Sequence, residues 1–511
     1  KGGYQYEGQL YDGKFAHVSG FDTCTTCHNP HTLEVQVAQC STCHTGVKAV
    51  EDLRDVRMAG SLSDYDGDGD VKEGIYYEIV GLQETLLQFI QTYATEVAGT
   101  DIAYNAHAYP YFFIDANGNG EVDEDETDRY NAWTPRLLKA AYNYQTSLKD
   151  PGAFAHNAKY IIQLLNDSAN DLNAALAEAA DLSALQRMDP GHFAGAKETF
   201  RHWDAEGMVP SSCAKCHSGY GLPFYLEHGT SIEQPATNGF LCSTCHSSLS
   251  EFTLHEDPEV EFPSGVTLSL KPENNLCLNC HQGRESTASV NRRIGNLPDD
   301  EVAEGLGFVN VHYFAAGATL FGGEAQGAYQ YANKEYAGRF THMPQYSECT
   351  QCHSTHALTV KVDACSGCHP SVTTSEEGLT SIRWTTTGDY DGDGNTAEGI
   401  AGEIATMVEA LYAAMQNYAT EVVGTSIAYS GNRYPYFFVD ANGNGQVDAD
   451  ETSRYATWTP RLLRAAYNYQ YVAKDPGGFA HNGKYLLQVL YDSLEDIGSQ
   501  VEVDMTGMIR P

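Results

Sequence analysis

Residues 24–44 read CTTCHNPHTLEVQVAQCSTCH, and residues 349–369 read CTQCHSTHALTVKVDACSGCH. Each stretch holds two CxxCH sequences, the motif to which a c-type haem is attached. Two thiols three positions apart can form thioethers with the two vinyl groups of one haem. The histidine that follows is then held beneath the iron as its proximal ligand. Each stretch therefore predicts a closely spaced pair of haem sites.

The same motif occurs three more times between these stretches, so the chain holds seven copies, which use all fourteen cysteines. A single copy could be a zinc half-site or a redox pair. Here no cysteine is left over, and every pair is followed at once by histidine, so the sequence predicts seven covalent haem c groups. Their attachment residues are Cys24, Cys27, His28, Cys40, Cys43, His44, Cys213, Cys216, His217, Cys242, Cys245, His246, Cys277, Cys280, His281, Cys349, Cys352, His353, Cys365, Cys368 and His369.

The composition limits what the chain can bind. Its net charge of −38, from 68 acidic and 30 basic residues, argues against nucleic acid and against anionic membrane surfaces as partners. No apolar run approaches the roughly 18 residues that a membrane-spanning helix needs. The 511 residues leave about 73 for each haem, so the porphyrins are expected to form much of the core themselves.

The cellular compartment follows from the predicted cofactor. The chain does not begin with a signal peptide, which favours an already processed protein, and no cysteine stands at its start to carry a lipid. Haem c is attached outside the cytoplasm, which implies export. We expect an extracellular or cell-surface location, with the periplasm as second choice.

An internal repeat organises the chain. Adding 325 to the residue number superimposes 1–170 on 326–495, and YPYFFIDANGNG at Tyr109 matches YPYFFVDANGNG at Tyr434 in all but one position. The repeat predicts a two-haem module over 1–180, a three-haem middle module over 181–325, and a second two-haem module over 326–511.

The expected fold is mainly α, with long irregular loops and little strand, wrapped around a chain of haems. Apolar residues at helical spacing predict a helix from Ile75 to Ile90, and another from Ile400 to Met415. Thr134 followed by Pro135 predicts a helix start. A further helix is expected over about 156–185, and the Gly- and Tyr-rich segment 305–340 is expected to connect the middle module to the last one.

Two acidic loops match the EF-hand pattern, in which side-chain oxygens at positions 1, 3 and 5, a turn glycine and a bidentate glutamate at position 12 surround calcium. The alternative is a bare polar turn. The predicted calcium-binding residues are Asp115, Asn117, Asn119, Glu121, Asp123 and Glu126, and in the repeat Asp440, Asn442, Asn444, Gln446, Asp448 and Glu451.

A second acidic loop precedes each of these and predicts a variant calcium site, which brings the expected ions to between two and four. Position 12 is Ile75 in one copy and Ile400 in the other, so the glutamate comes two residues early. The alternative is a solvated run of charge. The residues are Asp64, Asp66, Asp68, Asp70 and Glu73, and in the repeat Asp389, Asp391, Asp393, Asn395 and Glu398.

The seven motif histidines leave twelve others to fill the second axial positions of the irons. Histidines that recur in both modules are favoured, whereas His107 faces Asn432 in the other copy and is not expected to be a ligand. Methionine is the other possible ligand, but the surplus of histidine favours two imidazoles per iron. The predicted distal ligands are His17, His31, His156, His202, His228, His255, His312, His342, His356 and His481.

His31 and His356 need a separate argument, because each stands three residues after a proximal histidine. Such a residue is fixed on the proximal side of its own haem, so it is expected to bind the iron of a neighbouring haem. His312 has no counterpart in the first module, because subtracting 325 places it before residue 1. A partner for that module could come from another copy of the chain, in a head-to-tail polymer. The alternative is that the first copy lost the segment.

With its seven CxxCH motifs, CHxxH extensions and acidic loops, the chain resembles the exported multihaem c-type cytochromes of metal-respiring microbes, some of which form extracellular filaments. The resemblance implies an electron conduit that serves redox partner proteins or an extracellular acceptor. The alternatives are a multihaem nitrogen- or sulfur-oxyanion reductase with one open iron, and a calcium-dependent scaffold. Two imidazoles per iron leave no open position, which suits electron transfer rather than catalysis.

Overall fold

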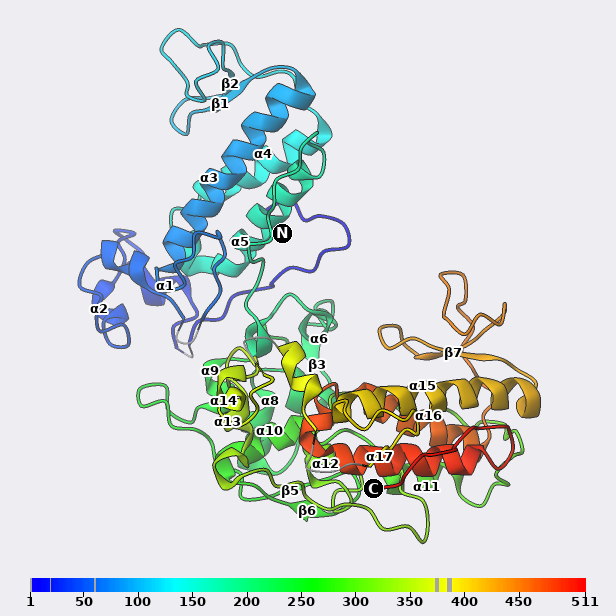
Figure 1. Ribbon diagram of the computed structural model, residues 1–511. Helices are drawn as coiled ribbons and strands as arrows, with labels where there is room; N and C mark the ends of the chain where they lie inside the picture. Colours follow the sequence, from blue (N-terminus) through cyan, green and yellow to red (C-terminus); the bar gives the residue numbers. More distant parts are fainter. Residues whose placement is uncertain (1, 19, 59–60, 373–375, 384–387) are drawn as a thin grey trace. The chain divides into compact units, whose positions relative to one another are not determined.

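The computed structural model describes residues 2–18, 20–58, 61–372, 376–383 and 388–511. The chain is mainly helical, and the strands within these residues are short and form two-stranded antiparallel ribbons (Figure 1). Contacts divide the chain into one unit of Lys1–Leu254 with Thr355–Thr359, and a second of His255–Ser354 with Val360–Pro511. The division into three modules remains a prediction from the sequence repeat.

Three helices form the bundle of the first unit: α3 (Ile75–Tyr93), α4 (Pro135–Leu148) and α5 (Ala153–Asn173). Leu86 and Ile90 of α3, Leu137 of α4 and Leu165 of α5 are each 0% exposed in its core. The helix predicted from the spacing of Ile75 to Ile90 is therefore confirmed, with its apolar side facing the other two helices.

The start of α4 is also confirmed. The Thr134 hydroxyl accepts a hydrogen bond from the Leu137 amide at 3.1 Å, and Pro135 occupies the first helical position, where no amide hydrogen is needed. Thr459 and Leu462 repeat the cap at 3.2 Å at the start of α16 (Pro460–Ala473).

The helix predicted over 156–185 is shorter than expected and ends at Asn173. The Asn173 side chain donates to the Ala180 carbonyl at 2.9 Å and accepts from its amide at 2.8 Å, which closes a turn in place of further helix. A kink lies directly after His156, where Asn157 has φ −167° and donates to the Gly13 carbonyl.

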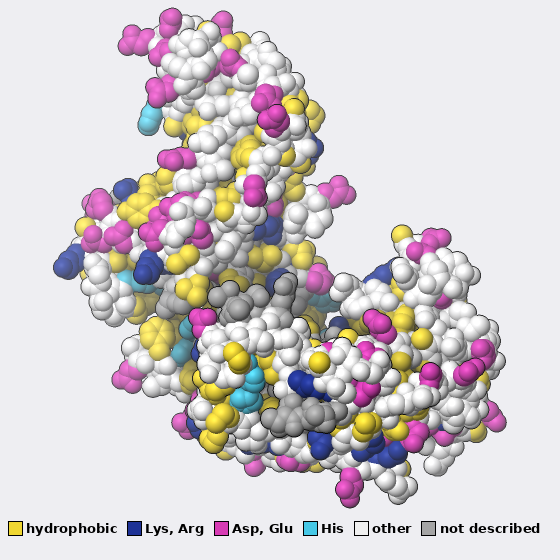
Figure 2. Space-filling view, viewed as in Figure 1, with side chains coloured by type: hydrophobic (Ala, Val, Ile, Leu, Met, Phe, Trp, Pro, Cys, Tyr) yellow, Lys and Arg dark blue, Asp and Glu magenta, His cyan; other side chains and the backbone are white. Residues whose placement is uncertain are grey.

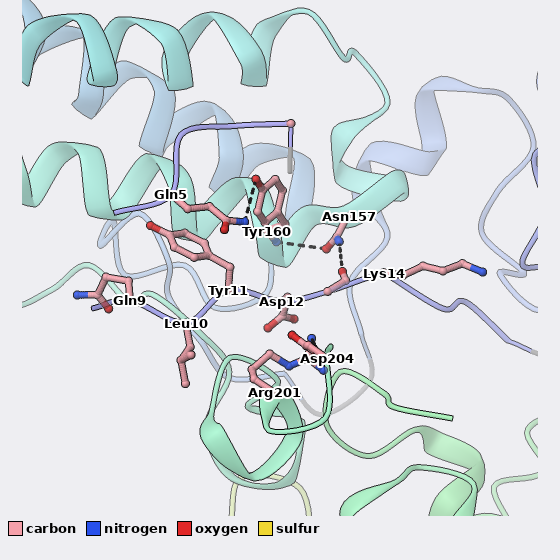
Figure 3. Close-up of a pocket in the computed structure, with 12 residues that line it drawn as sticks. Gln5, Gln9, Leu10, Tyr11, Asp12, Lys14, Asn157, Tyr160, Arg201 and Asp204 are labelled. Carbon is pink, nitrogen blue, oxygen red and sulfur yellow. Dashed lines mark hydrogen bonds and ion pairs between the residues drawn. The ribbon is translucent and has the colours of Figure 1, made fainter. Parts of the chain in front are cut away.

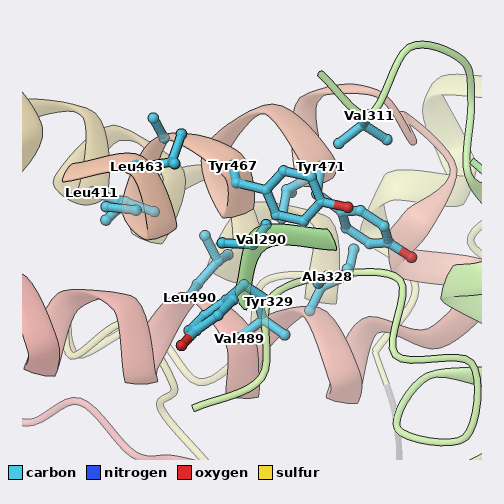
Figure 4. Close-up of a cluster of buried hydrophobic side chains, with 14 of the residues drawn as sticks. Val290, Val311, Ala328, Tyr329, Leu411, Leu463, Tyr467, Tyr471, Val489 and Leu490 are labelled. Atoms are coloured by element: carbon cyan, nitrogen blue, oxygen red, sulfur yellow. The ribbon is translucent and has the colours of Figure 1, made fainter. Parts of the chain in front are cut away.

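The second unit repeats the bundle with α15 (Ile400–Tyr418), α16 and α17 (Gly478–Ile497). Figure 4 shows Leu411, Leu463 and Leu490 packed together from these three helices, each 0% exposed. Segment 305–340 is part of this core rather than a connector, because Val311 and Ala328 are also 0% exposed. Both bundles therefore have apolar cores of side chains, and the contribution of the porphyrins to the interior stays a prediction.

The remaining elements are shorter. In the first unit they are α1 (Cys24–Cys27), α2 (Val37–Cys40), η1 (Glu51–Asp55), η2 (Ala94–Ala98), β1 (Ile102–Tyr104), β2 (Phe112–Ile114), η3 (Gly191–Phe193), α6 (Glu198–Arg201), β3 (Met208–Val209), α7 (Ser211–His217), α8 (Gly221–His228), β4 (Gln234–Pro235) and α9 (Cys242–Cys245). In the second unit they are β5 (Val260–Glu261), β6 (Thr267–Leu268), α10 (Pro272–His281), α11 (Thr287–Ile294), α12 (Ala316–Phe321), η4 (Pro344–Tyr346), α13 (Cys349–Cys352), α14 (Val362–Ser366), η5 (Glu376–Ser381), η6 (Ala419–Val423), β7 (Ile427–Tyr429) and β8 (Phe437–Val439).

A buried ion pair joins α3 to the segment that follows the first haem motifs. Arg57 Nη1 lies 2.6 Å from Glu78 Oε1, with side chains 8% and 0% exposed, and also donates to the Glu73 carbonyl at 3.0 Å. Arg383 makes the same contacts to Glu403 and to the Glu398 carbonyl. Arg383 lies 326 positions after Arg57, not 325, so the arginine keeps its contacts across a one-residue shift in the repeat.

Replacing Arg57 with alanine should lower the free energy of unfolding by about 3–5 kcal/mol, because the Glu78 carboxylate would stay buried without its partner. Thermal unfolding of the haem-loaded protein, followed by circular dichroism, measures the loss. Arg136→Ala is the matched control, since the Arg136–Asp171 pair is 38% and 25% exposed and should contribute less than about 1 kcal/mol. Equal effects of the two variants would contradict this assignment.

Acidic side chains are spread over the visible face of the molecule, where Lys and Arg are fewer (Figure 2). Within the described ranges, no helix has both the length and the apolar character required to cross a bilayer.

Candidate functional site

Each CxxCH motif is built on a short turn of helix. His28 donates its amide hydrogen to the Cys24 carbonyl at 2.8 Å, and His44 does the same to Cys40 at 2.9 Å. This helical hydrogen bond, from the amide of residue i+4 to the carbonyl of residue i, places the two thiols on one side of the turn, because residues three apart share a helix face. Thioethers from both thiols to a single haem require the thiols to lie on one side.

All fourteen cysteines lie within the described residues, and none forms a disulfide. Thiols of different motifs lie close together. Burial raises the pKa of Cys40, with Cys27 adding to the rise, and Cys352 is raised in the same way with Cys365 nearby. The Cys277 and Cys349 thiols share a hydrogen bond, so attachment points of separate motifs are in contact.

Among the described residues, motif histidines lie opposite a second histidine in five pairs of similar geometry. Their ring centres are separated by similar distances, between 6.1 and 6.4 Å, and their ring planes are tilted by 43–51°. The pairs are His44 with His17 at 6.1 Å, His28 with His156 at 6.2 Å, His246 with His356 at 6.4 Å, His369 with His342 at 6.2 Å, and His353 with His481 at 6.2 Å.

This separation has a chemical meaning. An imidazole nitrogen lies about 2.0 Å from a bound metal and about 1.1 Å from the centre of its own ring, so two imidazoles that share one metal have ring centres about 6.2 Å apart. The spacing therefore fits one iron between the two histidines of each pair.

Hydrogen bonds hold one ring nitrogen of several of these histidines. Nδ1 of His156 lies 2.8 Å from Asp150, and Nδ1 of His481 lies 2.8 Å from Asp475. Nδ1 of His246 lies 2.8 Å from the Phe252 carbonyl. A partner on Nδ1 fixes the ring and leaves Nε2 to bind a metal.

Burial lowers the pKa of His17 and His356 below the ordinary histidine value, with His44 and His246 adding to the effect. A lowered pKa favours the neutral imidazole, which is the form that binds iron. His481 differs: burial opposes its charged form, but Asp475 outweighs burial and raises the pKa.

The remaining motif histidines, His217 and His281, are held at Nδ1 by backbone carbonyls. Nδ1 of His217 lies 3.0 Å from the Thr199 carbonyl, and its ring centre is 5.3 Å from that of Trp203. Nδ1 of His281 lies 3.1 Å from the Phe314 carbonyl, and burial lowers the pKa of this histidine. Their Nδ1 atoms are thus held as in His246.

The ten predicted distal ligands divide accordingly. His17, His156, His342, His356 and His481 lie opposite motif histidines. His31 is exposed, His202 contacts Glu198 and Trp203, and His228 packs on Phe224, so among the described residues these three face no motif histidine. His255 and His312 are half-buried, and their roles stay predictions.

The EF-hand-like loops have ordered backbones. Asp115 accepts from the Gly118 and Gly120 amides at 2.6 and 2.7 Å, and Glu126 accepts from the Ala116 amide at 2.6 Å. Asp440, the counterpart of Asp115, repeats this pattern at 2.7 and 2.8 Å. Among the described residues, no three carboxylates converge in these two loops.

Carboxylates do converge in the upstream loops. Ligand atoms of Asp66, Asp68 and Glu73 lie within 4.8 Å of one another, as do those of Asp391, Asp393 and Glu398. Glu78 and Glu403 complete two further groups, with Asp64 and Asp66 and with Asp389 and Asp391. The sequence analysis missed both glutamates, because they lie beyond the twelve positions of an EF-hand loop.

It also missed Asp150 and Asp475, which orient two of the paired histidines. The signal was available, because DPGAFAH at 150–156 recurs as DPGGFAH at 475–481. An aspartate that keeps its distance from a recurring histidine in both copies is a candidate orienting residue.

A cavity of about 490 Å³ lies in the first unit beside the kink of α5. Figure 3 shows Asp12, Asn157 and Tyr160 facing it, with Arg201 below them. Asn157 directly follows His156, but the described lining contains no cysteine or histidine. The cavity therefore supplies neither an imidazole nor a thiolate for a haem iron.

The chain is homologous to polyhaem c-type cytochromes of Geobacter sulfurreducens. It is 27% identical over 420 residues to the C-type polyheme cytochrome OmcC, across 71% of this chain and 52% of that protein. It is also 27% identical over 379 residues to OmcB, named in the same way, across 63% of this chain and 48% of OmcB. The chain spans about half the length of these curated relatives. No family model and no solved structure matches it.

Proposed function

We propose that the chain carries seven covalent haem c groups, closed on both faces by imidazole, and conducts electrons among them outside the cytoplasm. The observation that carries the proposal is the recurring separation of 6.1–6.4 Å between motif histidines and second histidines. The homology to polyhaem c-type cytochromes supports covalent haem as the cofactor and electron transfer as the task.

Closed irons favour conduction over catalysis. A reductase needs one iron with an exchangeable position, whereas an iron held by two imidazoles keeps one geometry in both oxidation states. The alternative of a multihaem reductase therefore requires one open iron. Electron exchange between haems is supported by the contact of Cys277 with Cys349, which brings two attachment points together.

Carbon monoxide separates the two functions, because it binds ferrous haem only at an open or weakly held position. The isolated protein should contain seven haems per chain by pyridine haemochrome assay, show low-spin ferric signals, and bind little carbon monoxide after reduction. One tightly bound equivalent of carbon monoxide would overturn the conduit and favour the reductase.

Self-association is part of the proposal. His31 is exposed, whereas its repeat counterpart His356 faces His246, so His31 is available to a haem outside its own chain. A head-to-tail contact of this kind would extend the path for electrons from one copy to the next. Electron micrographs of native material should show filaments, and dispersed single particles would contradict this part of the proposal.

We also propose structural calcium in the loops 115–126 and 440–451. Support comes from the position-1 aspartates, which accept from two loop amides, and from Glu126, whose carboxylate closes back on the Ala116 amide at position 2. The acidic surface suits an exported protein whose partners are redox proteins or an extracellular acceptor.

A further inference from the structure

The loops before α3 and α15 hold carboxylates that the neighbouring protein groups do not satisfy. Asp391 is 4% exposed, and its Oδ2 has no hydrogen-bond partner among the residues that the structure describes. Oε1 of Glu398 and Oε1 of Glu73 are also buried and also have no hydrogen-bond partner among the described residues. A buried carboxylate oxygen without a donor is costly, so it needs either a proton or a cation.

The unsatisfied oxygens belong to the groups of three in which the carboxylates converge. Asp391 and Glu398 meet Asp393 with ligand atoms within 4.8 Å of one another, and Glu73 meets Asp66 and Asp68 in the first copy. Three carboxylates this close repel one another unless a positive charge lies between them.

Arg383 supplies only part of that charge. Its guanidinium is committed to Glu403, at 2.6 Å from Oε1, and to the Glu398 backbone carbonyl at 2.9 Å. Glu403 in turn accepts from the amides of Tyr390 and Asp391 at 2.7 and 3.0 Å. Glu403 therefore fixes the loop backbone and leaves Glu398 to face the ion.

We propose that the loop 389–398 binds one Ca²⁺ through Asp391, Asp393 and Glu398, and that 64–73 binds a second through Asp66, Asp68 and Glu73. Calcium is the cation that fits, because it takes six to eight oxygen ligands in an adaptable geometry, whereas Mg²⁺ requires a stricter octahedron and retains its water. These two sites are separate from the loops 115–126 and 440–451.

The position of the sites gives the ion a structural role. The segment that follows each haem pair passes close to the glycine before α3 or α15. A Cβ added to Gly74 would lie 1.8 Å from the Arg54 carbonyl oxygen, and one added to Gly399 would lie 1.9 Å from that of Thr380, so only glycine permits this approach. Ile75 and Ile400 also donate to the Val56 and Ile382 carbonyls at 3.2 and 3.0 Å. Calcium in the adjacent loop would fasten the haem-bearing segment to the bundle.

Native mass spectrometry of the haem-loaded protein tests the proposal by counting calcium. After chelation and re-addition of about 1 mM Ca²⁺, at the weak end of affinities for such sites, the chain should gain four ions. The double variant Asp66→Asn/Asp391→Asn should gain two fewer. The matched control Asp123→Asn/Asp448→Asn removes one carboxylate from each EF-hand-like loop and leaves the proposed sites intact.

The outcomes distinguish the sites from each other. A wild-type chain that gains only two ions, both lost in Asp123→Asn/Asp448→Asn, would overturn the proposal, and the carboxylates would then share a proton. If Asp66→Asn/Asp391→Asn fails to load haem, the number of ions that the wild-type chain gains decides the matter: four ions support the two proposed sites. Chelation of the wild-type protein should also lower the melting temperature of the bundles, and an unchanged melting temperature would contradict the fastening role.

Discussion

Replacing His481 with alanine should create a haem that binds about one equivalent of carbon monoxide per chain after reduction. The His481 ring lies 6.2 Å from that of His353, and Asp475 holds its Nδ1, so its loss would uncover one face of a single iron. The oxidised variant should also gain a high-spin ferric signal. Absorbance of the reduced protein under carbon monoxide, and electron paramagnetic resonance of the oxidised protein, measure the two effects.

Added imidazole should reverse both effects of His481→Ala, because free imidazole can enter the position that the side chain left. A purely structural role would not be rescued in this way. His107→Asn is the matched control, since His107 is exposed and asparagine occupies the equivalent position 432 in the repeat. If His481→Ala binds no more carbon monoxide than His107→Asn, His481 is not an axial ligand.

Replacing His356 with methionine should raise the midpoint potential of one haem by about 0.1 V or more, out of a range of roughly 0.8 V that axial ligands cover. The thioether stabilises ferrous iron relative to imidazole. Such a shift biases an electron toward that haem by about fifty-fold, since 59 mV corresponds to a factor of ten. Spectroelectrochemical titration of all haems measures the potential.

His31→Met is the control for this second variant, because His31 occupies the same place after its own CxxCH motif but faces no motif histidine among the described residues. In dissociated single chains, His31→Met should leave every potential unchanged. Equal shifts of a midpoint potential in both variants would show that the effect comes from the position of the histidine after its CxxCH motif, and not from the contact of His356 with His246. No shift in His356→Met would remove His356 as a ligand.

Local patterns predicted the helices well and the contacts between distant residues poorly. The stripe from Ile75 to Ile90 predicted α3 because a helix against a core needs apolar residues at that period. Thr134 and Pro135 predicted the start of α4 because capping involves only neighbouring residues. The end of α5 at Asn173 depended on a side-chain bond to Ala180, which no periodicity encodes.

The same distinction applies to the candidate sites. The repeat selected His17, His156 and their counterparts, because two copies of one module need the same ligands. It could not show that His356 meets His246 while His31 stays exposed, since that difference comes from the non-repeated residues around each copy. Glu78 was missed because the EF-hand pattern ends before it, although the folded chain brings it back to the loop.

The aspartates behind His156 and His481 have a consequence for the direction of electron flow. A carboxylate on Nδ1 makes an imidazole a stronger electron donor to its iron than a backbone carbonyl does, as found behind His246. The two carboxylate-backed irons should therefore give up electrons more readily than the carbonyl-backed ones. Electrons that enter at either duplicated segment would therefore move to the higher-potential haems in the middle of the sequence. The molecule would then store electrons as well as conduct them.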